Sequence, residues 1–293
     1  MPKTASTSLV FDPEARYVTS YLCSPAVLGF IRLLLGLYSL VTNLVVLIWT
    51  GVHSGLAGTY FSYFTHLSYI GVTAWLWASG VQSVMFANAI KSSGDDARYP
   101  LQSWPRPLQY LHEFLFSTIA TFPIIVTIVY WVLLATSDSF SDTFTAWSNI
   151  SQHVMNTLFV LFELIFTNLL PLTWIQLPAT IVLLGLYLGV AYVTQSTQGF
   201  YREFPSSYPG YLISHQHLPS PIRTTVAISL AYAFLDPQEQ GPLLAGYILG
   251  IAAGQIIVLI LVRYAIMLRI CVVGKKRPAT VGFNTHDIEG AAR

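Results

Sequence analysis

The sequence has 293 residues, of which 54% are hydrophobic and only 9% are charged, and its formal net charge is +1. A soluble domain carries about 25% charged residues, so most of the surface of this chain must face something apolar. This composition excludes an ordinary soluble globular protein, and the near-zero net charge gives no reason to expect nucleic acid as a partner. The aromatic share of 14% is typical of membrane proteins with Trp and Tyr at their interfaces.

Six stretches are long and apolar enough to cross a hydrocarbon core, which takes about 20 residues. They lie near residues 26–50, 61–89, 108–135, 147–170, 177–198 and 243–270. No cleavable signal segment is expected before the first stretch, which would then act as its own insertion signal. The sequence therefore predicts an all-α, polytopic transmembrane helical bundle, with residues 25–272 as one transmembrane domain.

Basic residues gather on one side of the six predicted spans. They occur in the N-terminal residues 1–24, in the loop between the second and third spans, and in the C-terminal residues 273–293. Because cytoplasmic loops carry an excess of Lys and Arg, we expect both tails to be cytosolic. Cys23 and Cys271 would then remain thiols in a reducing compartment. The membrane is expected to belong to the endomembrane system, such as the endoplasmic reticulum, or to be the plasma membrane.

Ionisable residues inside the predicted spans form an inner layer about two turns from the cytosolic surface. Its members are Arg32, Glu113, Glu163 and Arg263, on four different spans. Two arginines and two glutamates at one depth can neutralise each other. We interpret them as a buried charge network that fixes helix register, and a path for ions or protons is the alternative.

A second polar layer is predicted about two turns from the opposite surface. On the fourth span, residues spaced by four, three, four, three and four form one stripe: Asn149, His153, Asn156, Val160, Glu163 and Thr167. At 100° per residue this stripe is narrow, and its polar members favour contact with protein or a cavity rather than lipid. Thr65 lies at matching depth on the second span.

The pairing of Thr65 with His153 suggests nucleophilic catalysis. A threonine hydroxyl is a weak nucleophile unless a neighbouring base takes its proton, which neutral imidazole can do. In this hypothesis Asn149 or Asn156 orients the ring, and Asn43 or Tyr69 stabilises an oxyanion. The alternative is that His153 is a hydrogen-bonded packing residue.

Three local patterns follow one another along the chain. They are Tyr63-Phe64-Thr65, then Trp147-Ser148-Asn149 with His153 and Glu163, and then Gly199-Phe200-Tyr201 with, after a gap, Tyr232-Ala233-Phe234-Leu235-Asp236. In their order and helix placement they resemble the androgen-induced membrane hydrolase family, over roughly residues 33–262. The sequence looks closer to the divergent fungal relatives of that family.

The resemblance implies six spans and hydrolysis of fatty-acid esters of hydroxy fatty acids through a threonine and a histidine, which by motif are Thr65 and His153. Residues 202–231 depart from the pattern, because they separate two motifs that are almost continuous in relatives. We expect residues 201–232 to form an exoplasmic insert loop. A retained intron in the gene is the alternative origin of residues 202–231.

The competing function is a non-catalytic multi-pass membrane protein, either a small transporter or a lipid-binding or scaffolding bundle. Transporters usually show internal repeats and broken helices near the midplane, and the sequence shows neither. For the hydrolase, the expected partners are a membrane lipid or fatty-acid ester and the bilayer itself. No cofactor or metal is expected, and the oligomeric state is left open.

Overall fold

The computed structural model describes residues 10–54, 57–198 and 240–276, and every regular element in this part of the chain is helical. The longest helices are α1 (Pro25–Ser54), α2 (Phe64–Ser93), α3 (Arg106–Val129), α6 (Gln176–Gln198) and α9 (Leu243–Lys276). These five are long and apolar enough to cross a membrane. They bear out the all-α prediction and are compatible with an integral membrane protein. The insert 202–231 and the motifs at 199–201 and 232–236 lie outside the described residues.

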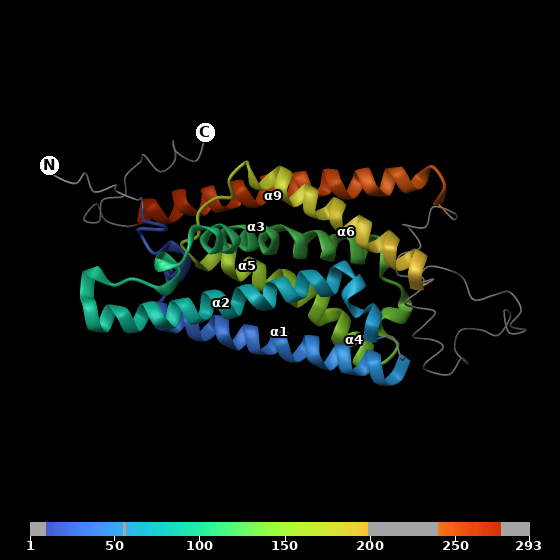
Figure 1. Ribbon diagram of the computed structural model, residues 1–293, viewed down its shortest axis with the longest axis horizontal. Coiled ribbons are helices and arrows are strands. Elements are labelled where there is room, and N and C mark those ends of the chain that lie inside the picture. Colours follow the sequence, from blue (N-terminus) through green and yellow to red (C-terminus); the bar gives the residue numbers. More distant parts are fainter. Residues whose placement is uncertain (1–9, 55–56, 199–239, 277–293) are drawn as a thin grey trace, which may run out of the picture.

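The predicted fourth span corresponds to three consecutive helical segments. Helix α4 (Thr143–Ile150) leads into a π-helical turn, η7 (Ser151–Met155), and then into α5 (Asn156–Phe166). A π turn holds one extra residue per turn and shifts the phase of the helix that follows. Figure 1 shows α4 and α5 as parts of one continuous run through the bundle.

Helix α5 ends inside the predicted span, and side chains satisfy its last backbone groups. The last four carbonyls of an α-helix have no intrahelical donor. Each of the four receives a side-chain donor: Thr167 donates to Glu163, Arg269 to Leu164, Tyr21 to Ile165 and Ser20 to Phe166. The end of α5 therefore joins the segment before α1 to the last turns of α9.

Helices α1 and α2 run antiparallel and side by side (Figure 1), and glycines allow their close approach. A Cβ added at Gly29 would lie 2.7 Å from Val84 Cγ2, and one at Gly80 would lie 3.0 Å from Leu33 Cγ. Small residues at such contacts let two helix backbones pack closely in a membrane protein. Of the five long helices α2 is the most enclosed and α6 the least, so α2 forms the centre of the bundle.

Residues 10–24, which precede α1, form a packed cap. Val18 is fully buried in a small cluster with Tyr99 and Leu101, which belong to the connection between α2 and α3. Asp12 accepts hydrogen bonds from the Tyr99 hydroxyl at 2.7 Å and from the Tyr17 amide at 3.0 Å. Burial raises the pKa of Asp12, although these bonds act to lower it.

Cys23 and Cys271 are free cysteines, as expected.

Candidate functional site

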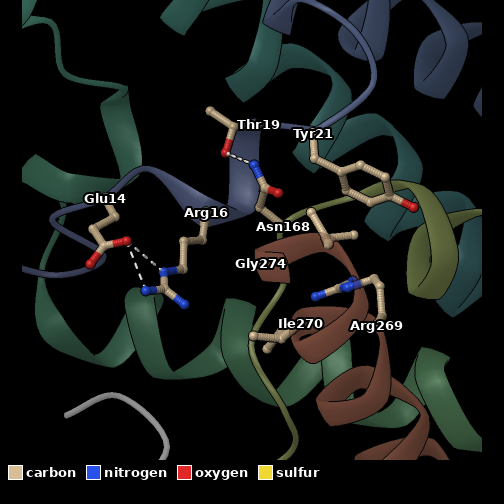
Figure 2. A pocket seen from close by; sticks show the side chains of 9 residues that line it. Glu14, Arg16, Thr19, Tyr21, Asn168, Arg269, Ile270 and Gly274 are labelled. Atoms are coloured by element: carbon tan, nitrogen blue, oxygen red, sulfur yellow. Dashed lines mark hydrogen bonds and ion pairs between the residues drawn. The ribbon is translucent and has the colours of Figure 1, made fainter. Parts of the chain in front are cut away.

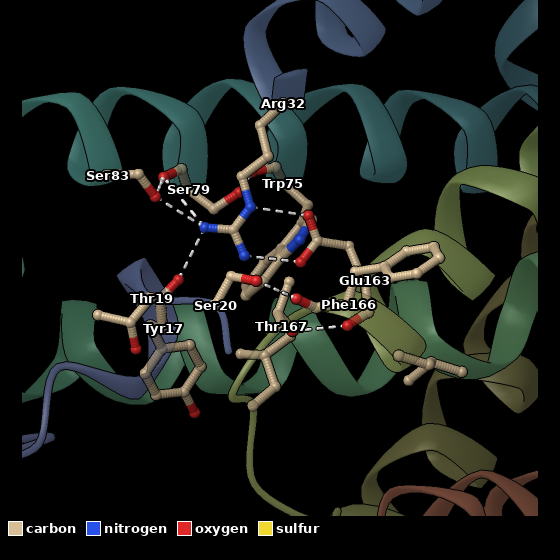
Figure 3. A network of polar contacts seen from close by, with 12 residues as sticks. Tyr17, Thr19, Ser20, Arg32, Trp75, Ser79, Ser83, Glu163, Phe166 and Thr167 are labelled. Atoms are coloured by element: carbon tan, nitrogen blue, oxygen red, sulfur yellow. Dashed lines mark hydrogen bonds and ion pairs between the residues drawn. The ribbon is translucent and has the colours of Figure 1, made fainter. Parts of the chain in front are cut away.

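The inner polar layer centres on a buried ion pair between α1 and α5 (Figure 3). Arg32 donates through Nε and Nη2 to the two carboxylate oxygens of Glu163, at 2.8 and 2.7 Å, and their side chains are 0% and 1% exposed. The third nitrogen of Arg32 donates to the Tyr17 carbonyl and to Ser83 Oγ, both at 2.8 Å. A buried pair is favourable only when its remaining hydrogen-bonding groups are satisfied. Arg32 meets that condition.

The other two members of the predicted charge network contact different groups. Arg263 donates to the Leu172 carbonyl, and its guanidinium lies 4.7 Å from the ring centroid of Trp174. Glu113 accepts a hydrogen bond of 3.2 Å from Gln176 at the start of α6. These contacts hold the connection between α5 and α6 against α3 and α9.

The outer polar layer begins where the chain enters α2. The first amide groups of a helix lack an intrahelical acceptor. Tyr187 of α6 compensates for one of them, because its hydroxyl accepts from the Phe64 amide and donates to the Ser62 carbonyl, both at 2.9 Å. By position, the amides of Thr65 and His66 are also without an intrahelical acceptor. The partial positive charge of the helix N-terminus therefore lies in the turn that carries Thr65.

His153 lies in the π turn η7, which packs against α2 and α3. Its side chain is 6% exposed, and its Nδ1 is buried with no hydrogen-bond partner in the part of the chain that the structure describes. The ring stacks on Tyr130, with centroids 3.5 Å apart and planes 5° apart. The hydroxyl of Thr127 donates to the His153 carbonyl at 2.6 Å. Stacking therefore holds the ring while Nδ1 stays without a partner.

His66 is a member of this layer that the depth argument did not identify. Its Nδ1 lies 2.7 Å from the Tyr60 carbonyl, its ring stacks on Tyr60 with centroids 3.8 Å apart, and its side chain lies near Gln152. Because a carbonyl only accepts, Nδ1 carries the proton. His66 is also an electrostatic neighbour of His153. The contact with Gln152 joins the first turn of α2 to the π turn.

Thr65 lies on the face of α2 between this histidine cluster and an apolar cavity. At 100° per residue, Thr65 is about 60° from Ser68 and about 40° from Tyr69 around the helix. Ser68 lines a cavity of about 250 Å³, together with Phe64 and Leu67 of α2 and with apolar residues of α3 and α6. Tyr69 is fully buried in the central cluster. The cavity therefore begins within one turn of Thr65.

Two of the four expected supporting residues are bound to groups other than the reacting pair. Asn43 donates to Thr73 Oγ1 at 3.0 Å and accepts from the Tyr60 hydroxyl at 2.8 Å, which ties α1 to α2. Asn149 donates to the Ser139 carbonyl at 2.9 Å. Asn43 and Asn149 are therefore each hydrogen-bonded to groups other than Thr65 and His153.

The other two supporting residues have unsatisfied polar atoms. Asn156 is 0% exposed, and neither its Oδ1 nor its Nδ2 has a partner within the described residues. The Tyr69 hydroxyl lies near Thr42 but outside hydrogen-bond geometry. Unpartnered buried amides are rare and costly. Both side chains thus remain available to a bound molecule or to ordered water.

The described residues hold no group of three or more His, Cys, Asp or Glu side chains placed to bind a metal ion. The group that could transfer a proton here is His153, whose electrostatic neighbour His66 lies in the first turn of α2. Compared with models of protein families, with curated proteins and with solved structures, the chain has no match in any of the three.

Proposed function

We propose that the protein is an intramembrane hydrolase of lipid esters, with Thr65 as the nucleophile and His153 as its base. The observation that carries the proposal is the state of His153. Its ring is buried and held by stacking on Tyr130, yet Nδ1 has no partner among the described residues. A buried nitrogen without a partner is costly, and a general base needs its nitrogen available.

The reaction follows from the groups that surround Thr65. Its hydroxyl oxygen attacks the ester carbonyl carbon, and the hydroxyl proton passes to the imidazole of His153. The tetrahedral oxyanion is stabilised by the amide groups of Thr65 and His66 at the start of α2. The imidazolium then gives its proton to the leaving alkoxide. Water hydrolyses the acyl-threonine, with His153 again taking the proton.

The apolar cavity beside Phe64 suits the acyl chain of such an ester. It opens between α2, α3 and α6, and its lining is almost entirely apolar. A lipid substrate reaches it from the bilayer, because α6 is the least enclosed of the long helices. These features favour fatty-acid esters of hydroxy fatty acids, or similar esters, as the substrate class. The proposal includes membership of the androgen-induced membrane hydrolase family.

We also infer six spans with both ends of the chain in the cytosol. Residues from the segment before α1 and from the last turns of α9 line one cavity, so both lie at the same end of the bundle. When both ends lie on the same side of the membrane, the chain must cross it an even number of times. Five long helices do not supply one, whereas the run from α4 through η7 to α5 adds the sixth. The basic residues near both ends favour the cytosol.

Labelling with a fluorophosphonate tests the proposal. The probe should modify the wild-type protein at Thr65, identified by mass spectrometry of the labelled peptide. The Thr65→Ala variant should not be labelled, and His153→Ala should be labelled much more slowly. Heat-denatured protein is the control for non-specific reaction. Labelling of Thr65→Ala at the wild-type rate would rule out Thr65 as the nucleophile.

A further inference from the structure

Two cavities of the bundle differ in how their polar side chains are used. The cavity at the inner end, of about 120 Å³, lies between the segment before α1 and the last turns of α9 (Figure 2). In it, Arg16 donates to Glu14 through Nε at 3.0 Å, and Asn168 donates to Thr19 Oγ1 at 3.0 Å. These groups are bound within the protein. The apolar cavity at the outer end, beside Phe64, contains a polar group that is not bound in this way.

Three of the side chains that line the outer cavity carry a hydroxyl group: Ser68, Thr118 and Tyr187. Thr118 donates to the Leu115 carbonyl at 2.8 Å, and Tyr187 donates to the Ser62 carbonyl at 2.9 Å. Ser68 is 7% exposed, and its Oγ has no hydrogen-bond partner within the described residues. Ser68 Oγ is therefore the hydroxyl of this lining that remains for a bound molecule.

Ser68 also differs from other buried hydroxyl residues of α2. A serine or threonine inside a helix can donate to the backbone carbonyl four residues earlier. Thr73, Ser79 and Ser83 each do so, at 2.9, 2.7 and 2.8 Å, whereas Ser68 does not. A buried hydroxyl without a partner costs free energy, so this one is expected to meet a polar group of a ligand.

The place of Ser68 on α2 indicates which part of a ligand it meets. Ser68 follows Thr65 by three residues, and Cβ atoms at that spacing on a helix are about 5–6 Å apart. In the proposed hydrolase the ester carbonyl lies at Thr65, so Ser68 lies beside the first carbons of the acyl chain. The lining residues Leu67 and Leu186 are 37% and 64% exposed, which leaves the rest of the chain a way out to the bilayer.

We propose that the outer cavity selects a fatty acyl chain with a hydroxyl group on its β-carbon, and that Ser68 Oγ hydrogen-bonds to that hydroxyl. Each hydroxyl can donate and accept, so the pair satisfies two groups that would otherwise lack partners in an apolar cavity. The position of the substituent rests on the proposed function, which places the carbonyl at Thr65. The inference specifies the acyl part of the proposed ester.

Binding of three fatty acids to the purified full-length protein in detergent tests this assignment. The hydroxyl group lies beside the carboxyl end in β-hydroxypalmitate and at the far end in ω-hydroxypalmitate, and palmitate has none. In isothermal titration calorimetry, wild type should bind β-hydroxypalmitate about fivefold more tightly than palmitate, the effect of one hydrogen bond between neutral groups. It should bind ω-hydroxypalmitate no more tightly than palmitate. Ser68→Ala should lose the preference for β-hydroxypalmitate.

Ser79→Ala is the matched control, because it removes a hydroxyl of the same helix that is bonded to the Trp75 carbonyl. It should keep the wild-type preference. Partition of each fatty acid into the micelles is the same for every variant, so it cancels when variants are compared. Thermal unfolding verifies that Ser68→Ala is folded.

Three results would overturn the proposal: no binding of β-hydroxypalmitate to wild type, equal affinity for β-hydroxypalmitate and palmitate, or a preference that persists in Ser68→Ala. Because binding does not require catalysis, the test separates this inference from the proposed function. A preference that depends on Ser68 in a protein without ester hydrolysis would refute the hydrolase and keep the cavity assignment. Ester hydrolysis without the preference would do the reverse.

Discussion

The two polar regions of the bundle differ in how completely their buried groups are satisfied. At the inner end, Arg32 and Glu163 use two N–H donors and both carboxylate oxygens on each other. At the outer end, His153 Nδ1 and both amide atoms of Asn156 have no partner among the described residues. A satisfied network holds helices in place, whereas unsatisfied buried groups are kept where a ligand or water uses them. This difference supports our proposal that the outer end holds the chemistry and the inner end is structural.

The inner end also has two unpartnered ring nitrogens, Trp75 Nε1 and His112 Nε2. These rings stack on each other with centroids 4.7 Å apart, and Tyr17 lies edge-on to both. They therefore belong to an aromatic cluster beside the ion pair. The outer end has the apolar cavity next to Phe64.

The largest effect on stability is expected from breaking the inner ion pair. Glu163→Ala leaves the buried guanidinium of Arg32 without its carboxylate, which costs about 3–5 kcal/mol. Thermal unfolding in detergent and the yield of folded protein measure this loss. The double variant Arg32→Met with Glu163→Leu should recover much of the stability, because neither charge remains. A Glu163→Ala protein that is stable but inactive would move Glu163 into the catalytic site.

A smaller effect of opposite sign is expected at Asn156. Replacement by Leu, of similar volume, removes two unsatisfied polar atoms and should leave stability unchanged or raise it by about 1–2 kcal/mol. The melting temperature of Asn156→Leu, measured beside wild type, checks this. A loss of more than about 2 kcal/mol would show that Asn156 is satisfied in the folded protein and that the contrast between the two ends is wrong there.

The smallest effect on stability is expected at Tyr130, which holds the ring of His153. Tyr130→Leu removes an aromatic stack worth about 0.5–1.5 kcal/mol. Because the imidazole of His153 is then no longer held in place, kcat should fall much more than stability does. Tyr130→Phe keeps the stack and is the matched control, so it should retain most of the activity. Equal activity in the Leu and Phe variants would mean that stacking does not position the base.

Five of the six predicted spans coincide with helices long and apolar enough to cross a membrane, because hydrophobic length is a local property. The first span, expected at residues 26–50, is α1 at Pro25–Ser54, and the fifth, expected at 177–198, is α6 at Gln176–Gln198. Depth along the helices also placed Arg32 and Glu163 together, and the structure pairs them. A charged side chain buried at a given depth in the membrane has few oppositely charged side chains within reach, so its partner is easy to identify from sequence.

The details of the outer site could not be predicted in the same way. The π turn at Ser151–Met155 shifts the helical phase within the stripe that carries His153, and an ideal 100° repeat does not include this shift. His66 was missed because its partners are the Tyr60 backbone and Gln152, which a search for ionisable pairs does not detect. Stacking of His153 on Tyr130 depends on how the π-helical turn Tyr130–Leu134, which follows α3, packs against the rest of the bundle, and no local pattern encodes this packing.

The most direct test of the central claim is a kinetic comparison of Thr65→Ala, His153→Ala and the double variant. The substrate is a fatty-acid ester of a hydroxy fatty acid presented in detergent micelles, and folding is verified by thermal unfolding. Each single variant should lose ester hydrolysis while keeping a stable bundle. Because the two residues act as a unit, the double variant should be no slower than either single. Wild-type kcat in a folded Thr65→Ala or His153→Ala protein would contradict the account.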